Sequence, residues 1–434
     1  MATGAACCVG GAHEGAEDGL SAAAPEDGGG RGAGATCFAA RPSHIPDMTH
    51  TGIERLLGGS HSHLRDAALG LVAHPASVTA GLVPSADALL ANGFSLRALF
   101  GPQHGALGEK QDNMIESGHF LDCRTGLPVH SLYSEVRQPT PEMLDGLDVL
   151  LFDLQDVGVR VYTFIWTMAL AMEACGEAGV EFAVLDRPNP VGDSREGPVL
   201  REGFESFVGL HPLPLRHGLT AGEIARWLNE ARGVTCDLTV IECEGWRRSQ
   251  WWDRTGLPWV LPSPNLPTLD SCAVYPGMVL VEGTNLSEGR GTTRPFEVFG
   301  APYLDAHALS DALNLRGMPG VRFRPCSFEP TFQKHAGAVC GGAQLHVTDR
   351  GRFRPVATAV TIFEEVRRQA PDEFAWIPPP YEYETEKTPI DILYGHDGLR
   401  LGVDAGGSAK DVLAGTEVDL AAFAAEVTPF LLYD

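Results

Sequence analysis

Short apolar runs alternate with amphipathic stretches along most of this 434-residue sequence, and the alternation constrains the fold more than any other feature. Five runs have the length of buried strands, namely ALGLVA (68–73), LRALF (96–100), LDVLLFDLQD (147–156), VEFAVLDRP (180–188) and LTVIEC (238–243). The predicted helices between them cover 84–93, 161–179 and 220–233, the last capped by Thr220 with Glu223 three residues later. Apolar strands that alternate with helices indicate a parallel sheet covered on both faces.

The pattern divides the chain into three predicted regions. Residues 1–47 are rich in Gly and Ala and poor in large apolar side chains, so we expect a disordered N-terminal extension. Residues 48–302 are predicted to form a Rossmann-like catalytic domain, and residues 303–434 a smaller α+β domain that closes the cleft. The candidate elements of the smaller domain are helices at 303–314 and 355–370 and strands at 321–330 and 342–349. No GxGxxG motif follows the first strand, so no cofactor is expected.

The balance of charges narrows the possible partners. With 56 acidic and 32 basic residues, the formal net charge of −24 disfavours nucleic acid and anionic membranes. No apolar run is long enough for a transmembrane helix, and the N-terminus lacks the basic and apolar regions of a secretory signal. The ten cysteines are scattered without a CxxC pattern, which is typical of reduced thiols. We therefore expect a cytoplasmic protein with a small-molecule partner, and export stays open as an alternative.

Three of the predicted strands run directly into polar loops that are rich in Gly or Pro. These loops cover residues 101–117, 155–163 and 186–198. Ligands of open parallel sheets bind beyond the carboxyl ends of the strands, so the three loops should meet at one edge. One such loop alone would more often be a simple turn. Three together, each with carboxylates or amides, favour a ligand pocket.

Residues 261–302 form a long segment rich in Pro and Gly without clear periodicity, which in a compact enzyme is usually functional. Its EGTNLSEGRGT motif carries Glu282, Asn285, Ser287, Glu288, Arg290 and Thr292. The glycines would let backbone amides approach a ligand closely. Arg290 and Arg294 could bind a carboxylate through two parallel hydrogen bonds. The alternative is a rigid polar turn held by internal ion pairs.

The remaining motifs exclude several kinds of chemistry. The histidines form no HxH or HExxH pattern, so no metal site is predicted. No GxSxG motif indicates a serine hydrolase. His104, in the first strand-end loop, is either a hydrogen-bond donor to substrate or a structural residue. Carboxylates, amides and arginines remain, and this set suits glycoside hydrolysis, in which one carboxyl group protonates the leaving oxygen.

Several long motifs, in the same order, resemble the exo-β-N-acetylmuramidase family. They are LFGPQHGALGEKQDNM, LLFDLQDVGVRVYTFIWTM, LDRPNPVG and PSPNLPTLDSCAVYPGMVLVEGTNLSEGRGTTRPFEVFGAP, and the resemblance extends from Met48 to the C-terminus. It implies a Rossmann-like domain followed by a smaller domain, with the site in the cleft between them. It also implies hydrolysis of terminal β-linked N-acetylmuramic acid, whose lactyl carboxylate would suit Arg290, Arg294 or Arg160.

One residue departs from the family pattern. Many relatives carry Glu in the loop read here as GPQHG, where this chain has Gln103, and an amide cannot donate a proton as a carboxylic acid does. We therefore expect Glu288 and Glu282 to be catalytic, with Glu109 as the replacement acid and Glu116 as a further candidate.

The other polar residues of these loops are expected to bind substrate. They are Gln103, His104, Gln111, Asp112, Asn113, Asp153, Gln155, Asp156, Arg160, Tyr162, Arg187, Asn189, Asn265, Asn285, Arg290, Thr292 and Arg294. Asp153 and Asp156 would bind sugar hydroxyls or order their loop. Two alternatives stay open: a sugar-binding relative that lost its acid at Gln103, and a glycosidase for another amino sugar. A cofactor-dependent oxidoreductase is disfavoured by the missing dinucleotide motif.

Overall fold

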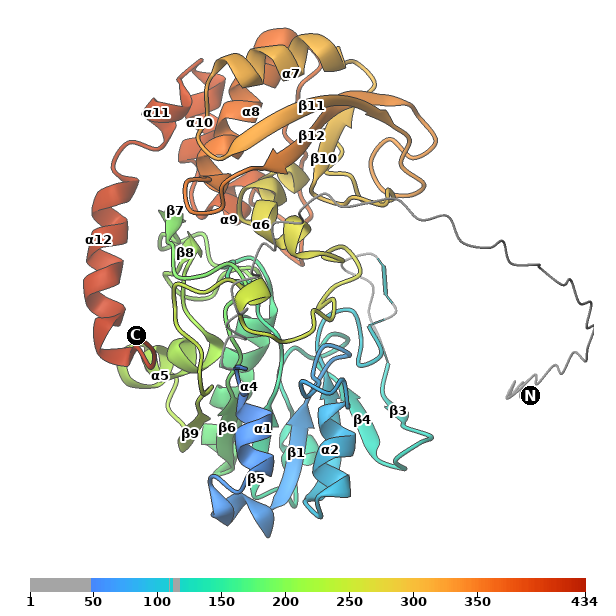
Figure 1. The fold of residues 1–434 in the computed structure, drawn as a ribbon, viewed down its shortest axis with the longest axis vertical. Coiled ribbons are helices and arrows are strands. Elements are labelled where there is room, and N and C mark those ends of the chain that lie inside the picture. The colour runs from blue at the N-terminus through green and yellow to red at the C-terminus, as the bar shows by residue number, and fades with distance from the viewer. Residues whose placement is uncertain (1–47, 109, 112–117) are drawn as a thin grey trace, which may run out of the picture. The chain divides into compact units, whose positions relative to one another are not determined.

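A seven-stranded sheet forms the base of the molecule (Figure 1) in the computed structural model, which describes residues 48–108, 110–111 and 118–434. Its strand order is β3-β4-β2-β1-β5-β6-β9, and every neighbouring pair is parallel except β3 and β4. The strands are β1 Ala68–Val72, β2 Ser95–Gly101, β3 Phe120–Leu121, β4 Pro128–Ser131, β5 Val149–Phe152, β6 Glu181–Leu185 and β9 Leu238–Ile241. The predicted parallel sheet is confirmed, and the order reverses between β1 and β5, which is where such sheets bind ligands.

Helices cover both faces of this sheet because its strands are apolar on both sides. On β5, Val149 and Leu151 pack with α1 Gly52–Leu57 and α2 Ser85–Ala91 on one face. Leu150 and Phe152 belong to the core on the other face, with α4 Phe164–Ala178 and α5 Ala221–Ala231. Burying one such side chain contributes about 1.5–3 kcal/mol, so each strand is held from two sides. The short α3 Pro141–Leu144 precedes β5, and η1 Ser62–Arg65 precedes β1.

The predicted cap of α5 is confirmed. Thr220 Oγ accepts a hydrogen bond from the Glu223 backbone N–H, and the Glu223 carboxylate accepts one from the Thr220 N–H. This reciprocal arrangement satisfies two donors that a helix N-terminus otherwise leaves without partners.

A smaller α+β part follows, as predicted, around an antiparallel sheet of order β10-β12-β11. Its strands are β10 Val298–Ala301, β11 Val321–Phe328 and β12 Cys340–Val347. Its helices are α6 Leu269–Met278, α7 Ala306–Leu315, α8 Pro355–Gln369, α9 Pro389–Tyr394, α10 Gly398–Asp404 and α11 Ala409–Val412. The boundary at residue 302 between the two domains stays a prediction.

The segment 261–302 contains more regular structure than its sequence indicated. It holds α6, the 3-10 helix η3 Val279–Gly283 and β10. Helix α6 shows no periodicity because residues 271–278 are all buried, so no polar face marks it. A Cβ atom on Gly277 would lie 1.9 Å from the Pro355 carbonyl oxygen, so only glycine lets α6 approach the start of α8 so closely.

The last residues of the chain return to the first sheet. Helix α12 Thr416–Val427 runs along the outside of the molecule (Figure 1), and η4 Thr428–Phe430 follows it. The Tyr433 hydroxyl then donates to Asp186 at the end of β6, at 2.5 Å, and the Leu432 N–H donates to Glu223. Burial raises the pKa of Asp186 to about 6 despite these hydrogen bonds. The C-terminal segment therefore ties the smaller part to the first sheet.

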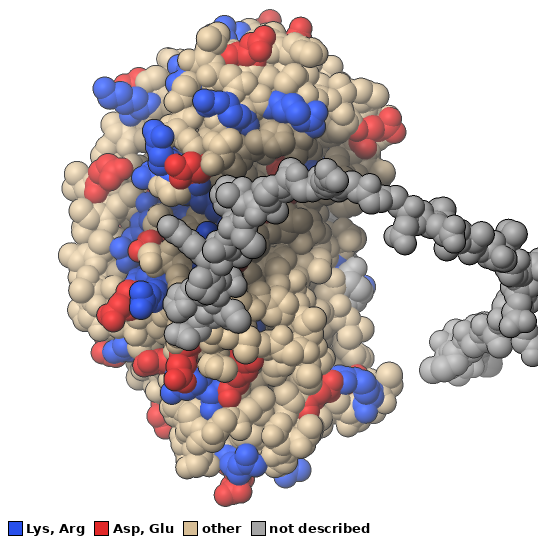
Figure 2. Space-filling view, in the orientation of Figure 1, with Lys and Arg blue, Asp and Glu red and all other residues tan. Residues whose placement is uncertain are grey.

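Charges are distributed unevenly over the surface. Figure 2 shows Lys and Arg side chains gathered along the left side of one face, although the chain as a whole carries a formal net charge of −24. Net charge therefore says little about the local field that a ligand would meet. Within the described part of the chain, no helix is long and apolar enough to cross a bilayer. The β7 Glu196–Val199 and β8 Pro214–Arg216 hairpin and η2 Trp252–Arg254 complete the elements.

Candidate active site

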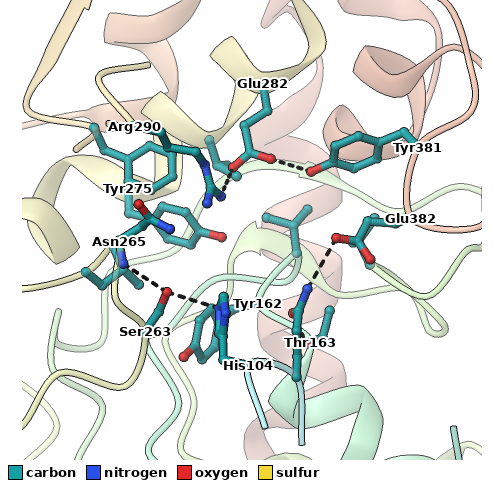
Figure 3. Close-up of a pocket in the computed structure, with 16 residues that line it drawn as sticks. His104, Tyr162, Thr163, Ser263, Asn265, Tyr275, Glu282, Arg290, Tyr381 and Glu382 are labelled. Carbon is teal, nitrogen blue, oxygen red and sulfur yellow. Dashed lines mark hydrogen bonds and ion pairs between the residues drawn. The ribbon is translucent and has the colours of Figure 1, made fainter. Parts of the chain in front are cut away.

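A pocket with an empty volume of about 420 Å³ lies between the ends of the parallel strands and the smaller part (Figure 3). His104, Tyr162 and Thr163 line its lower side in Figure 3. Together with Gln103, which also lines the pocket and accepts a hydrogen bond from Thr163, we call them the uncharged wall. Glu282, Arg290, Tyr381 and Glu382 line the opposite side, and we call them the charged wall.

Gln103 is held in one orientation by the residues around it. Its Oε1 accepts a 2.6 Å hydrogen bond from the hydroxyl of Thr163, the residue that precedes α4. Its Nε2 donates to the Tyr133 hydroxyl at 3.2 Å and to Glu382 Oε1 at 3.3 Å. Because an ionised carboxylate only accepts hydrogen bonds, the amide nitrogen is the end that faces Glu382, and Oε1 accepts from Thr163.

His104 is neutral, and its tautomer follows from its partners. Nδ1 lies 2.8 Å from the Lys110 carbonyl oxygen, which only accepts hydrogen bonds, so Nδ1 carries the proton. Nε2 then accepts a hydrogen bond from the Ser263 hydroxyl at 3.1 Å. Burial, together with the positive charge of Arg290, lowers the pKa of His104 to about 4, although the hydrogen bond to the Lys110 carbonyl raises it. His104 also has a φ of 70°, a left-handed conformation that costs a residue with a side chain about 1–3 kcal/mol and is more frequent at functional sites.

The charged wall is built around one buried ion pair. Glu282, on η3, accepts a 2.7 Å hydrogen bond from Arg290 Nη2 on one oxygen and a 2.5 Å hydrogen bond from the Tyr381 hydroxyl on the other. Arg290 is only 6% exposed, and burial would lower its pKa, but Glu282 and Glu288 together raise it. Its Nη1 has no hydrogen-bond partner among the residues that the structure describes. A buried donor without a partner, in the wall of a pocket, is suited to an anionic ligand.

Glu382 is the second carboxylate of the pocket, and the sequence analysis missed it. Its Oε2 accepts a 2.9 Å hydrogen bond from the Tyr133 hydroxyl, and its Oε1 faces the Gln103 amide. It follows Pro378–Pro380 in a segment that carries no strand-end signal, so the rule that located the other loops could not find it. The alternation YEYE at 381–384, with two tyrosines beside two carboxylates, was the available signal.

The structure places Glu288 outside the lining of this pocket. Its carboxylate lies 3.0 Å from Lys334 Nζ and 3.3 Å from Arg290 Nε. Burial would raise the pKa of Glu288, but Lys334 and Arg290 hold it below its usual value. Lys334 also donates to the backbone carbonyls of Val281, Glu282 and Leu286. Glu288 is therefore an anion within a structural cluster behind the charged wall, an arrangement unsuited to a proton donor.

Other residues at the ends of the predicted strands meet at the sheet edge outside this pocket. Arg187 Nε donates to the fully buried Asp153 at 2.7 Å, and Ser85 donates to the same carboxylate at 2.5 Å. Gln155 donates to the Pro188 carbonyl at 3.0 Å, and Asp156 accepts from the Gly158 N–H. The predicted convergence of the loops is therefore present, as a buried polar network that orders them.

Five further predicted residues form hydrogen bonds or ion pairs outside the pocket. Arg160 is fully buried and donates to the carbonyls of Pro198, Leu213 and Leu393, so its guanidinium is not offered to a ligand in this pocket. The others make local contacts: Asn189 with Leu219 and Val191, Asn285 with Glu373 and Tyr303, Thr292 with Gly289, and Arg294 with Glu297. Of the three arginines considered for a carboxylate, only Arg290 lines the pocket.

The last predicted residues lie at or beyond the limit of the described chain. Asn265 lines the pocket and donates to the Gln111 carbonyl at 2.7 Å. Glu109, Asp112, Asn113 and Glu116 lie outside the described residues. Among the residues that are described, no group of three or more His, Cys, Asp or Glu side chains could hold a metal ion.

Comparison with known proteins decides the family. The family model for the N-terminal domain of exo-β-N-acetylmuramidase NamZ matches residues 69–270, and the model for the C-terminal domain matches residues 273–433. The chain belongs to the NamZ family. It is 44% identical over 385 residues to the peptidoglycan β-N-acetylmuramidase NamZ of Bacillus subtilis strain 168, which covers 88% of this chain and 91% of that protein.

Solved structures agree with this assignment. A DUF1343 family protein from Bacteroides fragilis NCTC 9343 superposes with a TM-score of 0.81 at 34% identity, covering 90% of this chain and all of that one. A second DUF1343 protein from the same strain gives a TM-score of 0.70 at 27% identity, over 89% and 99% of the two chains. The pocket of this NamZ family member takes residues from both matched regions, with Gln103 and His104 in the first and Glu282 and Glu382 in the second.

Proposed function

We propose that this chain is an exo-acting glycoside hydrolase that releases terminal β-linked N-acetylmuramic acid from peptidoglycan fragments, and that the pocket between the two walls is its active site. The proposal is supported by membership of the NamZ family and by the name of the Bacillus subtilis relative. It is also supported by the pocket itself, which brings two carboxylates, an arginine and several neutral hydrogen-bonding groups together. This is the set of groups that glycoside hydrolysis requires.

Arg290 carries the proposal of substrate class. N-acetylmuramic acid differs from N-acetylglucosamine by a lactyl ether, which adds one carboxylate to the sugar. Arg290 lines the pocket, and its buried Nη1 has no hydrogen-bond partner among the described residues, so we propose that this guanidinium donates to that carboxylate. A charge-assisted hydrogen bond of this kind contributes about 1.5–3 kcal/mol, enough to separate the two sugars by ten- to a hundredfold.

Glu282 is proposed to act as an anion. Protonation of Glu282 would remove its ion pair with Arg290 and leave a buried guanidinium without that partner, which is costly. A carboxylate in this position stabilises the positive charge that develops on the sugar ring in the oxocarbenium-like transition state. The Tyr381 hydroxyl, at 2.5 Å, holds the second oxygen of Glu282 in place.

The test is the release of a chromophore from an aryl β-N-acetylmuraminide, compared with the matching β-N-acetylglucosaminide, each with and without a chelator. Cleavage of the muraminide alone, unaffected by the chelator, is the expected result. Cleavage of the glucosaminide at an equal rate would contradict the role of Arg290 and point to another amino sugar.

The second candidate is a sugar-binding relative without catalysis, and Gln103 is the observation that favours it. Binding of N-acetylmuramic acid, measured by calorimetry, without cleavage of either glycoside would support this alternative. We further propose a cytoplasmic location with imported cell-wall fragments as substrates, and no binding to nucleic acid or membranes. The acidic composition supports the last point.

A further inference from the structure

We propose that Glu382 is the catalytic acid of this pocket, and that Gln103 and Tyr133 are its positioning residues. The inference rests on the proposed function and assigns the proton transfer within it. It gives a role to a residue contributed by the smaller part of the protein, 279 positions away from Gln103 in the chain.

Among the described residues that line the pocket, two have carboxyl groups, Glu282 and Glu382. Glycoside hydrolysis requires one carboxyl group that donates its proton to the leaving oxygen and takes up a proton again later in the cycle. Glu282 is committed to the Arg290 guanidinium at 2.7 Å, and a proton on Glu282 would break that buried ion pair. Of these two carboxyl groups, Glu382 is therefore the one suited to proton transfer.

Two described groups hold Glu382 through contacts that are compatible with either protonation state of its carboxyl group. The Tyr133 hydroxyl and the Gln103 amide, both neutral donors, each contact one oxygen of Glu382, and neither contact requires a full negative charge on the carboxyl group. Burial raises the pKa of Tyr133 far above its usual value, so its hydroxyl remains a donor throughout. Thr163 fixes the Gln103 amide through a 2.6 Å hydrogen bond, so the amide nitrogen cannot turn away.

The proton of Glu382 passes to the glycosidic oxygen while the bond between that oxygen and the anomeric carbon breaks, and the bonding electron pair stays on the oxygen of the departing alcohol. Water, the co-reactant of hydrolysis, supplies the hydroxyl group that forms the new bond to the anomeric carbon. The remaining proton of that water passes to the Glu382 carboxylate, so Glu382 is protonated again and the enzyme regains its starting state.

The first experiment uses substrates that differ in their need for an acid. A dinitrophenyl β-N-acetylmuraminide has a leaving group that departs without a proton, whereas a disaccharide with terminal β-linked N-acetylmuramic acid needs one. We expect Glu382→Gln to lower kcat/KM for the disaccharide by about 10²–10⁴-fold and that for the dinitrophenyl glycoside by less than about tenfold. Glu282→Gln should impair both substrates to a similar extent, because it removes charge stabilisation.

Glu384→Gln is the matched control, since Glu384 lies in the same segment and binds the backbone N–H groups of Glu386 and Lys387 outside the pocket. It should retain wild-type rates on both substrates. The thermal unfolding temperature of each variant shows whether a loss of activity comes from misfolding or from removal of the acid. If Glu382→Gln misfolds, Glu382→Asp provides the second measurement, and it should show the same preference for the activated leaving group.

A second, independent measurement is the pH profile of Gln103→Glu. A carboxyl group at this position would lie beside Glu382, and two adjacent carboxyl groups hold one proton between them to higher pH. The pH at which kcat/KM falls on the basic side of its profile should therefore rise by about one unit or more. The other described ionisable groups around Glu382 are unchanged in this variant: Tyr133, Arg137 stacked on Tyr133 and Tyr383, and across the pocket Tyr275, Glu282, Arg290, Tyr381 and His104.

The outcomes separate the two proposals. Suppose that the wild-type protein cleaves the disaccharide, but Glu382→Gln lowers kcat/KM equally for both substrates or for neither. The assignment of the acid is then overturned, while the proposed function stands. An unchanged basic side of the pH profile in Gln103→Glu would also overturn it. If the wild-type protein cleaves neither substrate, the proposed function fails and Glu382 loses its role with it.

Discussion

The two walls of the pocket differ in the charge that they present. The uncharged wall offers an amide, a phenol, a hydroxyl and a neutral imidazole, all at or near the ends of parallel strands. The charged wall offers two carboxylates and a guanidinium from η3 and the loops of the smaller part. A sheet edge with oriented neutral groups can position a sugar by hydrogen bonds, whereas charges supply transition-state stabilisation and proton transfer. Under the proposed function, positioning of the sugar and the chemical step would therefore be assigned to different parts of the fold.

The largest effect is expected from the charged wall. Glu282→Gln keeps the shape of the side chain but removes the negative charge, so kcat/KM should fall by about 10³-fold or more if Glu282 stabilises the oxocarbenium-like centre. Steady-state kinetics on the aryl muraminide measure the effect, with circular dichroism as the control for folding. Retention of wild-type turnover would remove Glu282 from the catalytic groups.

Replacement of the cation should change specificity more than rate. Arg290→Lys keeps the positive charge beside Glu282 but loses the planar, bidentate geometry. The ratio of kcat/KM for muraminide over glucosaminide should fall by about 10–100-fold, which corresponds to the loss of one charge-assisted hydrogen bond. Parallel kinetics on the two substrates give this ratio. An unchanged ratio would show that another group recognises the lactyl carboxylate.

A smaller effect is expected from the uncharged wall. Thr163→Val removes the hydroxyl that holds Gln103 Oε1 and leaves the volume of the side chain nearly unchanged. Losing one neutral hydrogen bond costs about 0.5–1.5 kcal/mol, so kcat should fall by roughly 2–10-fold. A loss as large as that of Glu282→Gln, with the fold intact, would contradict the division between the walls.

The final prediction concerns stability rather than rate. The pKa of His104 is about 4 in the folded protein and 6.5 without the influence of the fold, so the unfolded chain binds more protons between these values. Stability should therefore fall as pH drops from about 6.5 to 4. His104→Asn should reduce this loss by on the order of 1–3 kcal/mol, measured by urea denaturation at pH 7 and pH 4.5. A pH dependence equal to that of the wild type would show that His104 accepts a proton without cost, and the uncharged wall would then be charged in mild acid.

The local pattern of apolar and polar residues was sufficient to predict the parallel sheet and the helices that cover it. The boundaries of β1, β2, α2 and α8 differ from the predicted ranges by a few residues at most, because each element buries its own apolar residues in a periodic order. Helix α6 escaped prediction since it is buried on nearly all sides and has no polar face. The hairpin of β7 and β8 and the short helices after α8 were also missed, as their segments are short and irregular in composition.

The site was only partly predictable, for a different reason. Gln103, His104, Glu282 and Arg290 were found because they lie in strand-end loops or in a glycine-rich motif. Glu288 and Glu282 lie six residues apart in that motif, and nothing local indicated that Lys334 would bind one of them and Tyr381 the other. Glu382 follows no predicted strand, and the alternation YEYE at 381–384 was its only local signal.

The sequence by itself determined the family, the parallel sheet and the motifs from which one wall of the pocket and half of the other are built. Only the tertiary structure decided which carboxylates face the pocket, which of three arginines can meet a ligand, and that Glu382 lies against Gln103. The physical reason is the separation along the chain over which each kind of interaction acts. Hydrophobic periodicity and turn chemistry act within a few residues, whereas hydrogen bonds and ion pairs between buried side chains join positions that come together only after the chain has folded.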